Sequence, residues 1–188
     1  MEDYALVIEY LPLGRANDPR KEPIAQLIGC GMFTLLEATV KPSANMVLGQ
    51  KIYVGKNERN EINHIKGRIG YNELTNAAKE FLLPILKKAI TEKEAEFIRF
   101  INNSRPISIR VHTLDLLPGI GKKNMEAIIK ERETKPFESF SDLHQRVPSL
   151  SDPHGIFAHR IISELQGNEK YYLFTKPPAH MINQGFHR

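Results

Sequence analysis

One short segment of this chain carries residues suited to holding a phosphate. Residues 117–124 read Leu-Pro-Gly-Ile-Gly-Lys-Lys-Asn, and apolar positions at Ile128 and Ile129 continue with helical spacing. Proline ends the short helical turn before the loop because it has no N–H to donate. Gly119 and Gly121 accept positive φ and carry no Cβ, so backbone N–H groups at the start of the following helix can point at an anion. The segment therefore predicts a phosphate site.

The same segment resembles the helix-hairpin-helix motif, a module that grips nucleic-acid backbone phosphates without reading sequence. The resemblance extends over residues 114–132, with Ile120 as an apolar plug between the two glycines. A plain turn between two packed helices is the structural alternative. The predicted phosphate contacts of this loop are Gly119, Ile120, Gly121, Lys122, Lys123 and Asn124.

An echo of this loop follows further along the chain. Residues 148–151, Pro-Ser-Leu-Ser, parallel residues 118–121, and an insertion is expected near residues 152–155. Serines restore a Cβ where backbone must approach a ligand, so we expect this second copy to be structural. Ser149 or Ser151 is expected to act as a turn or N-cap residue. The pattern predicts a tandem pair of helix-hairpin-helix units with a degenerate second hairpin.

The first third of the chain has the pattern of short β-strands separated by glycine- and proline-containing turns. The predicted strands cover residues 4–10, 24–28, 33–40, 51–54 and 62–71. About five short strands in so short a stretch predict a small closed barrel of the OB or S1-like kind.

Basic and aromatic residues on two of these strands suggest a second binding surface. Alternation places Lys51 and Tyr53 on one face of their strand, and likewise Lys66 and Arg68 on one face of theirs. Cations that follow a backbone and rings that stack on bases suit single-stranded nucleic acid. An ordinary solvated face is the alternative.

The middle of the chain is predicted to be helical. Residues 76–83 and 85–90 show helical apolar spacing, and Pro84 is expected to kink or divide them. The Thr-x-x-Glu pattern at residues 91–94 predicts a capping box that opens a helix ending at Asn102. The polar stretch 102–106 is the expected domain junction.

The resulting fold class is α+β, with four predicted parts along the chain. They are an OB-like β-barrel at 1–75, a helical bridge at 76–104, the tandem helix-hairpin-helix domain at 105–168 and a tail at 169–188. In the tail, residues 171–174 could form a short strand or a strip packed on a domain, while His180 and His187 are too isolated to indicate a metal.

The composition of the chain excludes several classes of function. The chain has 188 residues, a formal net charge of +4 and one cysteine, Cys30, which excludes an internal disulfide and a cysteine-only metal cage. No stretch approaches the roughly 18 apolar residues that span a bilayer, and no signal peptide is recognisable, so we expect a cytoplasmic protein without membrane contact. No cofactor, metal or catalytic residue is predicted.

Basic residues gather in two places that are well separated in the sequence. One group lies between Lys51 and Arg68, and the other lies around the glycine loop. The second group comprises Arg105, Arg110, Lys122 and Lys123. Two basic patches predict a composite surface for a nucleic-acid backbone.

Nearly the whole chain resembles an archaeal family of unknown function, the domain of unknown function numbered six hundred fifty-five. The resemblance rests on residues 3–7 (Asp-Tyr-Ala-Leu-Val), on residues 65–71 (Ile-Lys-Gly-Arg-Ile-Gly-Tyr) and on the glycine loop. Members are regarded as predicted OB-fold nucleic-acid-binding proteins, often discussed as RNA-binding. The resemblance implies a nucleic-acid partner and work near ribosome- or transcription-associated proteins.

These patterns together predict a non-catalytic, largely sequence-independent nucleic-acid-binding protein, with RNA slightly favoured over DNA. A helix-hairpin-helix DNA glycosylase is the enzyme alternative, since Lys123 and Asp142 have suggestive positions. Strands before the hairpin argue against it, because that enzyme needs a large helical body there. A protein-binding adaptor that uses the region near Tyr171 and Tyr172 is a third class.

Overall fold

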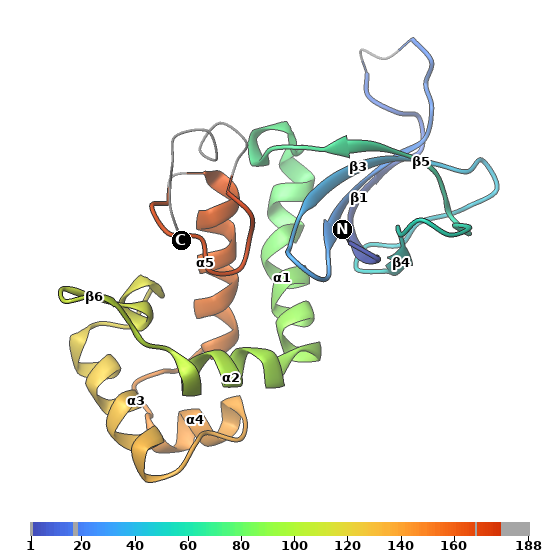
Figure 1. Cartoon of the computed structure of the whole chain (residues 1–188). Coiled ribbons are helices and arrows are strands. Elements are labelled where there is room, and N and C mark those ends of the chain that lie inside the picture. The colour runs from blue at the N-terminus through green and yellow to red at the C-terminus, as the bar shows by residue number, and fades with distance from the viewer. Residues whose placement is uncertain (1, 17–18, 168, 178–188) are drawn as a thin grey trace. The chain divides into compact units, whose positions relative to one another are not determined.

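The protein combines a curled β-sheet with a set of helices. A computed structural model describes residues 2–16, 19–167 and 169–177 (Figure 1). The chain divides into two compact units, which we call the sheet unit (Met1–Ile85 with Ser163–Arg188) and the helical unit (Leu86–Ile162). The division falls within two long helices, whereas the sequence placed its domain junction at residues 102–106.

The sheet unit is built on five antiparallel strands. They are β1 (Tyr4–Leu11), β2 (Ile24–Gly29), β3 (Leu35–Val40), β4 (Lys51–Tyr53) and β5 (Ile62–Arg68). Their spatial order is β4-β1-β2-β3-β5, and every neighbouring pair is antiparallel. Strands β4, β1, β2 and β3 thus have the order of a Greek key, the arrangement on which OB barrels are also built.

The five predicted strands are confirmed, and the alternation of their side chains gives the sheet one apolar face. One face of the sheet forms an apolar core, because alternate residues of each strand point to the same side. That core contains Ala5, Val7, Ala25, Leu27, Leu36, Ala38, Val40, Met46, Ile52, Val54 and Ile62. Residues of β2 and β3 are buried throughout, so both faces of these two strands are covered.

The sheet is curled, but it does not close into the barrel that we expected. Strands β4 and β5 end the order, and no ladder joins them among the described residues. Strand β4 has only three residues, and the β3–β5 ladder carries two register irregularities. The sheet therefore has the form of a partial barrel (Figure 1).

A buried carboxylate near the N-terminus ties down the turn between β2 and β3. The oxygens of Glu2 accept hydrogen bonds from the backbone N–H groups of Gly31, Met32 and Thr34. Near the other end of the described chain, Glu164 accepts from the N–H groups of residues 173–175 in the same way. This contact confirms that residues 171–174 form a packed strip rather than a strand; His180 and His187 lie outside the described residues.

The first long helix corrects two expectations. After the 3₁₀ turn η1 (Tyr71–Glu73), helix α1 (Asn76–Glu92) runs without a break through Pro84. Leu82 and Leu86 are fully buried on either side of the proline, so packing outweighs the lost hydrogen bond. The predicted capping box was also wrong: the Thr91 hydroxyl donates to the Lys87 carbonyl inside α1.

The helical unit contains the remaining elements. Helix α2 (Glu94–Asn103) is followed by a small hairpin of β6 (Pro106–Ser108) and β7 (Val111–His112), and then by the 3₁₀ turn η2 (Thr113–Leu116). The last helices are α3 (Lys122–Thr134), α4 (Phe140–Arg146) and α5 (Pro153–Gln166).

Aromatic and arginine side chains hold the helical unit together. The Phe157 ring lies within 6.0 Å, centroid to centroid, of those of Phe97, Phe100 and Phe140. Arg132 on α3 donates to the carbonyls of Ile101 and Ser104 at the end of α2. The expected junction at residues 102–106 is therefore anchored within this unit.

Candidate functional site

The loop at residues 118–121, which we call the first loop, connects η2 to α3. Gly119 has φ +84°, in the left-handed region that favours glycine, whereas Gly121 has φ −78° and is the N-cap of α3. The N–H of Ile120 donates to the Leu117 carbonyl, and the N–H of Met125 donates to the Gly121 carbonyl. The turn and the first helical hydrogen bond are thus both formed.

Apolar side chains hold the first loop from beneath. Ile120 is buried, as are Leu114 and Leu117 before it and Ile128 on α3. Ile120 is therefore the apolar plug that the sequence predicted. This side of the first loop is therefore anchored by apolar contacts.

The outer side of the first loop is open and positively charged. A Cβ placed on Gly121 would meet no atom within 4 Å, and no side chain caps the N-terminus of α3. Lys122 and Lys123 are exposed, and neither has an ion pair among the described residues. The first N–H groups of α3 have no partner within the helix, and its dipole favours an anion there.

The second loop, residues 148–151, has the same turn but a different helix start. The N–H of Leu150 donates to the Val147 carbonyl over 3.0 Å, as Ile120 does to Leu117, and Leu150 is buried. Helix α5 is then capped by a carboxylate: Asp152 Oδ1 accepts from the Gly155 N–H at 2.9 Å. The N-cap is therefore Asp152 and not a serine.

The insertion expected at residues 152–155 is also smaller than predicted. Ser151 alone separates Leu150 from the N-cap, whereas Gly121 follows Ile120 directly. Residues 153–155 already belong to the first turn of α5. The two loops thus differ by one residue and by the presence of a capping acid.

Asp152 is itself neutralised. Lys87 Nζ lies 2.6 Å from Asp152 Oδ2. The Lys87 hydrogen bond and the Gly155 N–H lower the pKa of this carboxyl below its usual value. The second helix start therefore contains an internal anion and its counter-charge.

A side-chain link joins the two loops. Asn124 on α3 donates to the Gly119 carbonyl over 3.3 Å, and the Ser149 hydroxyl donates to Asn124 Oδ1 over 2.7 Å. A cavity of about 330 Å³ lies between the loops, lined by residues of both and by His159 on α5. Sequence reasoning had assigned Asn124 to the phosphate contact only and had missed this link.

On the sheet unit, the structure adds one residue to the predicted basic and aromatic face. Register places Tyr4 of β1 opposite Tyr53 of β4, and their ring centroids are 5.5 Å apart. Lys51 Nζ lies 5.5 Å from the centroid of the Tyr4 ring, and Tyr4 is 48% exposed. Lys51 and Tyr53 therefore share a face with Tyr4. Sequence reasoning missed Tyr4 as a member of this face, although its place at the start of an alternating strand could have indicated it.

The other predicted pair on the sheet does not share a face. An extra residue at the β3–β5 irregularity makes Gly67 the partner of Glu37 and Arg68 the partner of Leu36. Lys66 instead forms an ion pair with Glu37, Nζ to Oε1 3.2 Å. The expected common face of Lys66 and Arg68 was thus wrong, because a bulge breaks the alternation on which it relied.

Glu37 is the centre of a charge cluster. Its Oε2 lies 2.5 Å from Arg15, in addition to the contact with Lys66. Burial acts to raise the pKa of Glu37, but Arg15 and Lys66 outweigh it and hold the pKa below its usual value. The ammonium group of Lys66 is therefore engaged within the sheet unit and is less available to a ligand.

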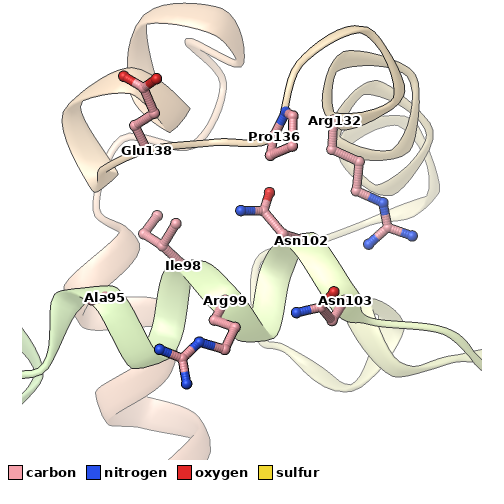
Figure 2. A pocket seen from close by; sticks show the side chains of 8 residues that line it. All are labelled: Ala95, Ile98, Arg99, Asn102, Asn103, Arg132, Pro136 and Glu138. Atoms are coloured by element: carbon pink, nitrogen blue, oxygen red, sulfur yellow. The ribbon is translucent and has the colours of Figure 1, made fainter.

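Another cavity, of about 430 Å³, lies on α2 (Figure 2). Its polar side chains do not converge: Asn102 points towards Pro136, whereas Arg99 points away from it. Asn102 also exchanges two hydrogen bonds with the backbone of Phe137. These groups pack the helical unit and do not form a reactive cluster.

Asp142, the acid of the glycosylase alternative, and His154 on α5 both have structural contacts. Asp142 Oδ2 accepts from the Glu138 N–H and pairs with Arg146, and the His154 ring packs edge to face on Phe140. Within residues 2–16, 19–167 and 169–177, no group of three or more His, Cys, Asp or Glu side chains could hold a metal ion. No helix in that part of the chain is long and apolar enough to cross a bilayer.

A partial barrel followed by helices that present two related loops defines the class of fold, and known proteins share it. The family model described as "Protein of unknown function (DUF655)" matches residues 1–176, so this chain belongs to the DUF655 family. An uncharacterised protein of Methanocaldococcus jannaschii is 45% identical over 177 residues, covering 93% of this chain and 80% of that protein.

A solved structure agrees with this assignment. The crystal structure of Af1531 from Archaeoglobus fulgidus, described as a DUF655 protein, matches with a TM-score of 0.89 and 41% identity. The match covers 93% of this chain and all of the other. The family resemblance expected from the sequence is confirmed.

Proposed function

We propose that this protein binds nucleic acid without catalysis and largely without regard to sequence, and that its first loop holds one backbone phosphate. In this proposal residues 118–124 act as a helix-hairpin-helix contact, with backbone N–H groups aimed at the phosphate and Lys122 and Lys123 beside it. RNA is favoured slightly over DNA, an expectation that rests on the family resemblance.

The difference between the two helix starts carries the proposal. Helix α5 is capped by its own Asp152, whereas α3 begins at a glycine with no capping side chain. The same turn precedes both helices, so the open start of α3 is not a requirement of the turn. An anion supplied by a ligand would complete α3 as Asp152 completes α5.

The charge beside the open helix start points the same way. Lys122 and Lys123 directly follow the N-cap of α3 and have no ion pair among the described residues, a property that they share with other exposed lysines such as Lys88 and Lys130. Their place beside uncapped backbone donors is what suits them to phosphate binding.

The sheet unit would add a second contact through the face that carries Lys51, Tyr53 and Tyr4. Arg68, which pairs with the core residue Leu36, does not share that face and would be a separate cation.

A binding series tests this proposal. Labelled single- and double-stranded RNA and DNA are titrated by fluorescence anisotropy over a range of salt concentrations. In the double variant Lys122→Glu/Lys123→Glu we expect weaker binding and a shallower salt slope, because each lost phosphate contact removes roughly 0.7 to 0.9 from that slope. The matched control is Lys88→Glu/Lys130→Glu, which makes the same charge change at exposed lysines elsewhere in the helical unit.

Gly121→Ala gives a test that leaves charge unchanged. Alanine adopts φ −78° without strain and its Cβ meets open space, so the variant should fold normally. The added methyl group would nevertheless stand where a phosphate approaches the backbone. Equal affinity of wild type and Gly121→Ala for every probe would contradict phosphate binding by the first loop, and release of a damaged base from duplex DNA would favour the glycosylase.

A further inference from the structure

The β6–β7 hairpin presents an apolar side chain entirely to solvent. Residues 105–110 are all exposed, and Ile109 at the tip has a relative exposure of 106%. The next most exposed large apolar residue in the described chain is Leu13 at 75%. Nothing within the described residues covers Ile109.

This hairpin is firmly attached at its base. Pro106 pairs with His112 and Ser108 with Val111, while Thr113 donates from both its N–H and its hydroxyl to the Arg105 carbonyl. A β-hairpin this short is not stable alone, so the Thr113 contacts at its base help to keep it formed.

His112 links the hairpin to the first loop. It is buried, its N–H donates to Asp115 Oδ2, and its Nδ1 accepts from the Leu114 N–H. Asp115 and Leu114 belong to η2, which leads directly into the first loop. The hairpin tip and the first loop are therefore parts of one continuous segment of the helical unit.

The charges around Ile109 are of one sign. Arg105 and Arg110 flank the tip, and the sequence has no acidic residue between them or before Asp115. Neither guanidinium has an ion pair among the described residues, and the Asp115 carboxylate is used by the His112 N–H. The hairpin tip thus carries an exposed apolar side chain between two unpaired guanidinium groups. This combination suits a polyanion that can also bury an apolar side chain.

We propose that Ile109 is a wedge that enters between stacked bases of a paired nucleic acid while Arg105 and Arg110 bind the adjoining phosphates. The inference rests on the proposed function and sharpens it. Proteins that kink duplexes insert apolar side chains between neighbouring base pairs and unstack them. Insertion is favourable for the side chain because it leaves water for the apolar surroundings of the bases. The substrate class is then a duplex with a weakly stacked step, such as a bulge or mismatch, held at one phosphate by the first loop.

The test uses the full chain and an RNA duplex with 2-aminopurine beside a single-nucleotide bulge, because this base becomes brighter when it is unstacked. Wild type is expected to raise its fluorescence on binding. Ile109→Ala should abolish the rise and weaken binding to the bulged duplex about tenfold, which is the loss expected for one buried aliphatic side chain. Ile109→Leu should retain both the fluorescence rise and the affinity of wild type. Ile107→Ala, at a neighbouring residue that is only 40% exposed, is the control.

Different outcomes separate this inference from the proposed function. If wild type binds the duplex with a normal salt slope but leaves 2-aminopurine stacked, or if Ile109→Ala matches wild type, the wedge is wrong and phosphate binding stands. The exposed tip would then be a contact for another protein. If wild type binds none of the nucleic acids, both proposals fail together; circular dichroism of Ile109→Ala excludes unfolding as the cause of its loss.

Discussion

The Ser149 hydroxyl donates a 2.7 Å hydrogen bond to Oδ1 of Asn124, whose amide donates in turn to the Gly119 carbonyl. One side chain of α3 therefore fixes the backbone of the first loop and binds the second loop. The two loops are coupled through Asn124 and are not independent copies of one turn.

A double-mutant cycle should detect this coupling. Asn124→Ala and Ser149→Ala are each expected to destabilise the protein, with a coupling energy of about 0.5 to 1 kcal/mol, the range of an exposed neutral hydrogen bond. Urea denaturation of the four proteins gives the value. Ser151→Ala is the control, and strictly additive effects of Asn124→Ala and Ser149→Ala would show that the link is not formed in solution.

The two glycines of the first loop should respond differently to alanine. Gly119→Ala forces a Cβ into a left-handed conformation and is expected to cost about 1 to 2 kcal/mol of stability. Gly121→Ala has extended backbone and free space, so it should cost less than about 1 kcal/mol. Thermal unfolding of both variants measures the difference, and the prediction fails if Gly121→Ala is the more damaging change.

Glu9 is expected to make stability fall as pH rises. Burial raises the pKa of this carboxyl above 4.5, although the Ala78 N–H and the charge of Arg15 act to lower it, and its Oε2 has no hydrogen-bond partner in the described chain. A raised folded pKa gives stability that is full below the unfolded pKa and is lost as pH rises through the folded pKa. Glu9→Gln should remove this decline, measured as unfolding free energy against pH above 4.5; an unchanged profile would falsify it.

Glu37 should act in the opposite direction. Because Arg15 and Lys66 hold its folded pKa below 4.5, it contributes stability that is present above the unfolded pKa and lost as pH falls through the folded pKa. Glu37→Gln is therefore expected to destabilise the protein at neutral pH and to reduce the loss of stability in acid. A pH series of urea midpoints checks both effects, and Glu58→Gln at an exposed site is the control.

Pro84 offers a stabilising change. It lies inside α1, is exposed, and lacks the N–H that an interior helical residue donates. Pro84→Ala should restore that hydrogen bond and raise the unfolding free energy by about 1 to 3 kcal/mol. A lower thermal midpoint for Pro84→Ala would mean that the proline shapes α1 in a way the buried Leu82 and Leu86 require.

The features that depend only on residues close together in the sequence were predicted correctly. Short β-favouring segments between glycine- and proline-containing turns located all five strands, and the Ile120 plug and the glycine turn follow from residues adjacent in the sequence. The extra residue beside Gly67 could not be foreseen, because a bulge depends on the partner strand and leaves no mark in the alternation itself. Lys66 was assigned to ligand contact for that reason.

Tertiary contacts account for the other differences. A local rule disfavours proline in helix interiors, but burial of the residues around Pro84 overrides that rule in α1. Thr91 and Glu94 have capping-box spacing, yet Thr91 bonds back into α1 and Glu94 receives the Phe140 N–H from α4. Asp152 was within the expected insertion, and only the helix start revealed its role as a cap.

The carboxylate of Asp152 also gives the helical unit an internal template for its proposed ligand. Its Oδ1 lies 2.9 Å from the N–H of Gly155, the third residue of α5, and a lysine neutralises its other oxygen. The third residue of α3 is Asn124. If the first loop binds a phosphate as proposed, one phosphate oxygen is expected opposite the Asn124 N–H, with Lys122 or Lys123 in the place that Lys87 takes at the second loop.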